Sequence, residues 1–176
     1  MTMTNLMTQI VISISEVMET MFYIPVEPRD GYITIGESEL FADVSGILKY
    51  SNRNNSISGS DTIHAAIITF HGNFSGTISL IVPENLLMIM TENFMGEKRE
   101  NLTSDHLEGT LKETLNMLAG NTFSKVDSEL SFCLGVPEIY TSSLINSTKK
   151  GGAYFNNPLL VIDTMDGAMG VTVDIE

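Results

Sequence analysis

The spacing of apolar residues changes several times along this chain, and these changes restrict the fold to one that mixes helices and strands. Near the start, apolar residues recur every three or four positions, which is the period of an amphipathic helix. They are Leu6, Ile10, Ile14, Val17 and Met21. Pro25 and Pro28 end this helix, because proline cannot continue the helical hydrogen bonding.

Extended runs follow the first helix and give way to helical patterns again. Runs rich in β-branched and other apolar residues predict strands over Leu40 to Tyr50, Thr62 to Phe70 and Ser75 to Val82. The short link His71 to Phe74 predicts a hairpin. Pro83 then opens a short helix over Glu84 to Met95. The longest helix is predicted from Ser104 to about Lys125, with Ser104 or Asp105 as its cap.

The last part of the chain returns to extended patterns. Strands are predicted over Ser131 to Val136, Gly152 to Phe155, Leu159 to Thr164 and Ala168 to Ile175. Asp166-Gly167 predicts a tight hairpin. We expect Cys133, in an apolar run, to be a small buried residue. We expect the final run, Val171 to Ile175, to lie at a sheet edge, where unpaired backbone groups would allow a homodimer to form.

Two parts of the chain have the same layout, which indicates an internal duplication. Ile68 to Val82 and Ile162 to Glu176 each contain a strand, a glycine-containing turn and a glycine-led strand, with Gly76 corresponding to Gly170. The two long helices also correspond. We therefore expect one α+β domain over residues 1–176, an internally duplicated helix-plus-strands layout with an antiparallel-rich sheet covered by two long helices.

Composition excludes several classes of partner. The chain has 22 acidic and 9 basic residues, a net charge of −13, which argues against nucleic acid and anionic membrane surfaces. A single cysteine cannot form an internal disulfide, so we expect a reducing compartment, the cytoplasm. No Lys or Arg precedes Arg29, and Glu16 and Glu19 interrupt the first apolar stretch, so we expect no signal peptide. No apolar run is long enough to predict a membrane span.

The long helix has two faces of different chemistry. Its leucines at 107, 111, 115 and 118 gather within about 80° of arc and predict a buried stripe. Gly109, Glu113, Asn116 and Gly120 gather on the opposite side. Glycine inside a helix costs about 1 kcal/mol relative to alanine, and core packing does not explain that cost on an exposed face.

The outer face therefore looks like a docking surface with a carboxylate and an amide one turn apart. A plain structural explanation is also open. Exposed Glu and Asn residues are common on helices, and Gly120-Asn121 would suit a C-terminal cap.

The segment from Glu113 to Asn121 resembles the E-x-x-N-M-x-x-G-N motif of the CheC/CheX/FliY chemotaxis phosphatases. Pro137 resembles the proline that follows this motif in the family, and Ser15 to Phe22 resembles the first helix of CheX-like proteins. Together with the internal repeat, the resemblance covers essentially the whole chain and is strongest to CheX.

The resemblance implies a phosphatase that hydrolyses the aspartyl-phosphate of a CheY-like response regulator in chemotaxis or two-component signalling. Asn116 would orient the attacking water, and Glu113 would pair with the receiver domain's lysine. Gly109, Met117 and Gly120 would belong to the partner-binding surface. The receiver domain would supply Mg²⁺, so this chain would bind no cofactor of its own.

Two departures from the family pattern keep other functions open. The first helix has Glu19 where the motif needs Asn, so one working site and one lost site are expected, as in CheX. Gly109 stands where the family usually has Asp or Ser, and Asp105 is a poor substitute. The alternatives are a non-catalytic CheC-like adaptor, a flagellar-switch-type binding module, or a relative that shares only the fold.

Other chemistries have no pattern in the sequence. His64, His71 and His106 show no metal-ligand spacing with each other or with Cys133, so no metal site is assigned. The chain also has no phosphate-binding loop, dinucleotide fingerprint or serine nucleophile elbow.

Overall fold

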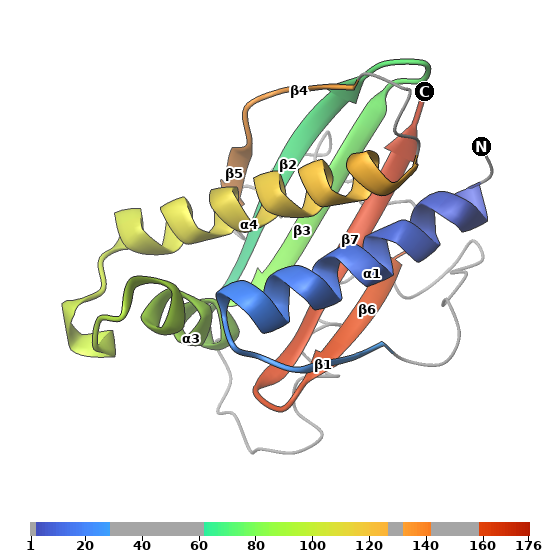
Figure 1. The fold of residues 1–176 in the computed structure, drawn as a ribbon. Helices are drawn as coiled ribbons and strands as arrows, with labels where there is room; N and C mark the ends of the chain where they lie inside the picture. Colours follow the sequence, from blue (N-terminus) through green and yellow to red (C-terminus); the bar gives the residue numbers. More distant parts are fainter. Residues whose placement is uncertain (1–2, 29–61, 127–131, 142–158) are drawn as a thin grey trace.

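The computed structural model describes residues 3–28, 62–126, 132–141 and 159–176 (Figure 1). In chain order its elements are α1 (Met3–Met21), β1 (Val26–Pro28), β2 (Ile63–His71), β3 (Gly76–Pro83), α3 (Glu84–Met95), η1 (Arg99–Asn101), α4 (Ser104–Val126), β4 (Cys133–Leu134), β5 (Glu138–Thr141), β6 (Leu159–Thr164) and β7 (Gly167–Ile175). The strands predicted over Leu40 to Tyr50 and Gly152 to Phe155 lie outside the described residues.

The strands of the described chain form one sheet in the order β1-β6-β7-β3-β2-β4, with β5 also paired to β2. Every neighbouring pair is antiparallel. The helices α1 and α4 lie side by side across one face of this sheet, and α3 lies near the C-terminal end of α1 (Figure 1). The predicted α+β class, with two long helices covering an antiparallel sheet, is confirmed.

The strand order also confirms the internal duplication. The first half supplies α1, β1, β2 and β3, and the second supplies α4, β5, β6 and β7. The β2–β3 and β6–β7 hairpins meet at the central β3–β7 pair. The outer strand β1 of the first half pairs with β6 of the second, and β5 of the second half pairs with β2 of the first. Gly76 and Gly170 stand at opposite ends of the β3–β7 ladder, opposite Ile175 and Ile81, as a two-fold repeat requires.

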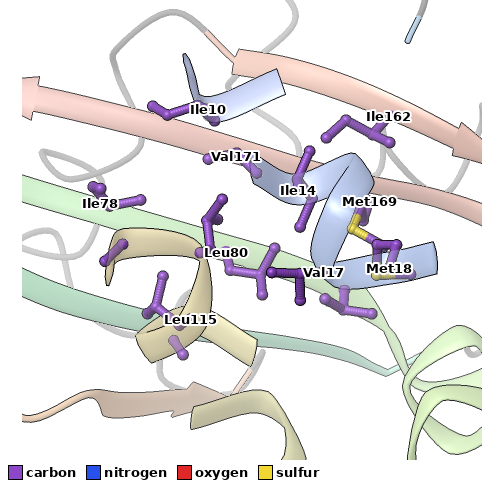
Figure 2. Close-up of a cluster of buried hydrophobic side chains, with 14 of the residues drawn as sticks. Ile10, Ile14, Val17, Met18, Ile78, Leu80, Leu115, Ile162, Met169 and Val171 are labelled. Carbon is purple, nitrogen blue, oxygen red and sulfur yellow. The ribbon is translucent and has the colours of Figure 1, made fainter. Parts of the chain in front are cut away.

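Alternation along the central strands directs one set of apolar side chains towards the helices. Ile14, Val17 and Met18 of α1 and Leu115 of α4 pack against this set (Figure 2). The sheet residues in that view are Ile78, Leu80, Ile162, Met169 and Val171, all at most 1% exposed. Burying one such side chain stabilises the fold by about 1.5–3 kcal/mol. This packing fixes which face of α4 points away from the sheet.

Two expectations about the later strands are wrong. Cys133 is exposed, as is its neighbour Leu134. The reason is that β4 has only two residues and, within the described chain, pairs only with β2. The final run is no sheet edge, because β7 pairs with both β3 and β6. The predicted homodimer therefore cannot form through β7 as an unpaired edge strand.

The two predicted hairpins are present. Phe70 pairs with Gly76 across the first turn, and Thr164 pairs with Gly167 across the second. Gly167 has a φ of 145°, a backbone conformation that favours glycine. No helix of the described ranges is long and apolar enough to cross a membrane.

Candidate functional site

The helix α4 begins with a reciprocal cap that the sequence reasoning missed. The His106 backbone N–H donates to Thr103 Oγ1, and the Thr103 backbone N–H donates to His106 Nδ1, both at 3.3 Å. The capping residue is therefore Thr103, where the sequence suggested Ser104 or Asp105. A Thr followed three positions later by a side chain that can accept a hydrogen bond was the available pattern.

The two predicted faces of α4 are confirmed. The four stripe leucines are at most 8% exposed and pack into the core. On the opposite side Gly109, Glu113 and Gly120 are exposed, while Asn116 and Met117 are half-buried. Because α4 continues to Val126, Gly120 lies inside the helix, and the C-terminal cap explanation is wrong.

Packing among the described residues does not require glycine on the outer face of α4. A Cβ atom added at Gly109 or Gly120 would meet no atom of the described residues within 4 Å. The opposite holds at Gly76, where a Cβ would collide with the Asp174 carbonyl oxygen, and at Gly135, where it would collide with Thr69. Gly109 and Gly120 therefore expose helix backbone on a surface where packing among the described residues does not require it.

Glu113 and Asn116 project from this surface one turn apart, with Cβ atoms about 5–6 Å from each other. Within the described part of the chain, neither side chain makes a hydrogen bond or an ion pair. Asn93 illustrates the contrast, since its Nδ2 donates to the Phe22 carbonyl oxygen at 2.6 Å. The carboxylate and the amide of α4 are therefore both free to contact a partner.

The corresponding positions of α1 differ in residue type and in contacts. Glu16 and Glu19 are both exposed, and Glu16 Oε2 accepts from Lys125 Nζ of α4 at 2.6 Å. The first repeat therefore offers two carboxylates, one already ion-paired, and no amide at the second position.

An aromatic cluster holds the C-terminal part of α4 to the β2–β3 hairpin. Phe123 of α4 stacks on Phe132 with ring centroids 4.4 Å apart, and lies 4.6 Å from the Phe70 ring of β2. Phe74 of the hairpin turn completes the cluster. No periodic pattern connects these four residues in the sequence. Nearby, Pro137 is buried directly before β5.

The described residues contain no group of three His, Cys, Asp or Glu side chains placed to hold a metal ion. On the outer face of α4, Glu113 offers a carboxylate and Asn116 a neutral amide one turn further along the helix.

The antiparallel, internally duplicated sheet under two long helices, together with the family-model match, places the chain in the CheC/CheX/FliY class of chemotaxis proteins. The model of the family described as chemotaxis phosphatase CheX matches residues 64–158, more than half of the chain, including all of α4. The chain belongs to this CheX family.

Solved structures agree with this placement at the level of the fold. CheX from Vibrio vulnificus is 14% identical, with a TM-score of 0.62, covering 97% of this chain and 96% of that one. CheX from Desulfovibrio desulfuricans is 17% identical, with a TM-score of 0.62, covering 97% and 99%. A chain of the CheX–CheY–BeF3–Mg²⁺ complex from Borrelia burgdorferi is 15% identical, with a TM-score of 0.61, covering 97% of each chain. Comparison with curated protein sequences found no significant match.

Proposed function

We propose that this protein hydrolyses the aspartyl-phosphate of a CheY-like receiver domain, acting in the cytoplasm in chemotaxis or a related two-component pathway. The observation that carries the proposal is the pair Glu113 and Asn116 on the outer face of α4, which has no partner among the described residues and lies between two glycines that no described atom crowds. Membership of the chemotaxis phosphatase family supports it.

The reaction needs a water molecule held in line with the bond from phosphorus to the aspartate oxygen. Water forms the new bond to phosphorus, the aspartate carboxylate leaves, and inorganic phosphate is released. The Asn116 amide suits the positioning of this water, because it can both donate and accept hydrogen bonds and puts no charge beside the phosphoryl oxygens. Positioning is most of what a protein adds to phosphoryl transfer.

Glu113 has a different part in this proposal. Its carboxylate would pair with the receiver's lysine in a charge-assisted contact, which fixes the register of the two proteins. Mg²⁺ would be bound by the receiver domain rather than by this chain. The Borrelia burgdorferi structure is a complex of CheX and CheY with BeF3 and Mg²⁺, and its composition fits such a division of parts.

A non-catalytic adaptor is the second candidate. Gly109 favours it, because the family usually has Asp or Ser at this position and Gly109 has no side chain to interact with the partner. An adaptor would keep the docking surface of α4 and lack the chemistry.

The test is to phosphorylate a panel of receiver domains with a small-molecule phosphodonor and to follow loss of the phosphoryl group. We expect the wild-type protein to accelerate hydrolysis on at least one receiver. Asn116→Ala should abolish the acceleration while retaining most of the affinity, because the ordered water is lost and the docking surface remains. The control is Asn73→Ala, which removes an exposed amide from the β2–β3 turn.

Each other outcome has a definite meaning. Wild-type rate in Asn116→Ala would exclude the water-positioning part. Binding of a phosphorylated receiver without acceleration by the wild-type protein would identify the adaptor.

A further inference from the structure

Tyr23 has an unusual conformation at the end of α1. Its φ is +56°, the only positive value of a non-glycine residue in the described chain, and its side chain is 78% exposed. The backbone N–H groups of Phe22 and Ile24 both donate to the Met18 carbonyl oxygen, and both side chains are buried. The left-handed turn thus places two neighbours in the core and leaves the tyrosine ring outside.

Tyrosine is a poor choice for this turn on grounds of stability. Glycine or asparagine adopts a positive φ with less strain, and a bulky residue there is an outlier. An exposed ring also gains nothing from burial. Strained residues of this kind concentrate at functional sites, so contact with a partner would account for the residue that occupies this position.

Two further apolar side chains are exposed on the helix that contacts the end of α1. They are Phe94 and Met95 at the end of α3, 38% and 41% exposed. The ends of the two helices are in direct contact, because the Phe22 and Phe94 rings lie 5.8 Å apart and Asn93 Nδ2 donates to the Phe22 carbonyl oxygen. We refer to Tyr23, Phe94 and Met95 as the aromatic–methionine patch.

Tyr23 of this patch and the Glu113–Asn116 pair lie at similar positions along the two packed helices α1 and α4. α1 and α4 run antiparallel (Figure 1), and the Glu16–Lys125 ion pair sets their register. From the ion pair towards the C-terminal end of α1, Tyr23 lies about 10 Å beyond Glu16. Because α4 runs the opposite way, Asn116 and Glu113 lie about 14–18 Å from Lys125 in that same direction. Packed helix axes are about 8–10 Å apart.

These dimensions bring Tyr23 and the Glu113–Asn116 pair within the width of one protein–protein interface. A standard interface covers about 800 Å² on each partner, a region about 30 Å across. The chain's net charge of −13 gives no overall attraction towards a negatively charged phosphoryl group. Apolar contact beside the pair would supply affinity that does not depend on charge.

We propose that the aromatic–methionine patch is a second contact surface for the phosphorylated receiver domain and binds an apolar part of the receiver beside its phosphorylation site. This inference rests on the proposed function, because the receiver that occupies the α4 surface is also the occupant of the patch. In this proposal Tyr23 contributes to the affinity for the receiver, and Asn116 contributes to the chemical step.

The experiment compares kcat and KM for dephosphorylation of a receiver by the wild-type protein, Tyr23→Asn and Tyr23→Phe. Tyr23→Asn should raise KM about tenfold, as expected for an anchoring tyrosine, and leave kcat unchanged. Its thermal midpoint should not fall, because asparagine tolerates the left-handed backbone. Tyr23→Phe should keep the wild-type KM. The control is Met165→Ser, which removes an 88% exposed apolar side chain from the β6–β7 turn.

Unchanged KM in Tyr23→Asn would overturn the proposal, as would an equal rise in Met165→Ser. Light scattering adds a third test, since a wild-type dimer that Tyr23→Asn dissociates without changing KM would identify a second copy of this chain as the occupant. If the wild-type protein dephosphorylates no receiver, binding to receivers activated with beryllofluoride and Mg²⁺ replaces KM. Tenfold weaker binding by Tyr23→Asn would then uphold the patch although the proposed catalysis had failed, and no wild-type binding would overturn both.

Discussion

At the scale of single residues, the proposed site separates two tasks between a charged and a neutral side chain. Glu113 is exposed and Asn116 is half-buried, one turn further along α4. A side chain that orients water benefits from the firmer support of partial burial. A side chain that reaches for a partner's lysine benefits from exposure and charge. The residue types and their burial therefore agree with the division proposed for them.

This division predicts that Glu113→Gln changes binding and leaves catalysis intact. Glutamine keeps the shape of the side chain and removes its charge, so KM for the receiver should rise about tenfold, the effect of losing one charge-assisted contact. The value of kcat should stay near that of the wild-type protein. Glu108→Gln, a half-buried position on the same helix, is the matched control. A lower kcat at unchanged KM would assign Glu113 to the chemical step instead.

Predictions for single residues were correct where helical periodicity determines burial. They were wrong where burial or capping depends on how short an element is or where it ends. The leucine stripe of α4 is buried because a helix repeats its faces regularly. Cys133 has apolar neighbours in the sequence, but its strand is too short and too peripheral to be covered. Thr103 caps α4 through its side chain, which a hydrophobic pattern does not report.

At the scale of elements, α4 is fixed on one side and open on the other. The leucine stripe anchors it to the sheet, the phenylalanine cluster holds its C-terminal part, and Thr103 caps its start. Its outer face has two glycines that no atom of the described chain approaches within 4 Å of an added Cβ. A rigid helix with an open face positions side chains for a partner without moving when the partner binds.

The glycines of α4 give a prediction in which stability and function change in opposite directions. Gly109→Ala and Gly120→Ala should each raise the free energy of unfolding by about 1 kcal/mol, because alanine is the better helix former and its Cβ would meet none of the described residues. Each should also raise KM for the receiver if the bare backbone is part of the interface. Urea denaturation and steady-state kinetics measure the two effects.

Gly76→Ala is the control for this pair of substitutions. Its Cβ would collide with the Asp174 carbonyl oxygen, so stability should fall. Lower stability in Gly109→Ala or Gly120→Ala would show that the fold needs those glycines after all.

The long elements were predictable from the sequence and the short ones were not. The predicted bounds of α3 and β6 match the structure, and α4 ends one residue beyond its prediction. By contrast, β1 and β5 were missed, because strands of three and four residues are too short to show alternation. They form through pairing with β6 and β2, which are distant in sequence. The place of β7 inside the sheet likewise depends on a distant partner, β3.

At the scale of the whole molecule, the fold has approximate two-fold symmetry, but the candidate site occurs on only one of the two equivalent helices. The β3–β7 pair relates the two halves, so α1 and α4 occupy equivalent positions on the sheet. Only α4 combines a free carboxylate with an amide, since Glu16 is ion-paired to Lys125 and Glu19 replaces the amide. The duplication supplied two equivalent helices, and the residue differences leave one of them equipped for the proposed reaction.

Net charge gives the prediction that belongs to the molecule as a whole. With a charge of −13, the protein repels a receiver whose own net charge is negative, and this repulsion slows their encounter. The screening length falls from about 30 Å at 0.01 M salt to about 8 Å at 0.15 M. We therefore expect kcat/KM for such a receiver to rise several-fold over this range, because long-range repulsion is screened more than the short contact between Glu113 and the receiver's lysine. Steady-state kinetics at graded salt, with the receiver's activity towards its phosphodonor as the control, measures the effect. A steady fall of kcat/KM with salt would instead mean that local attraction at the α4 surface outweighs the charge of the whole protein.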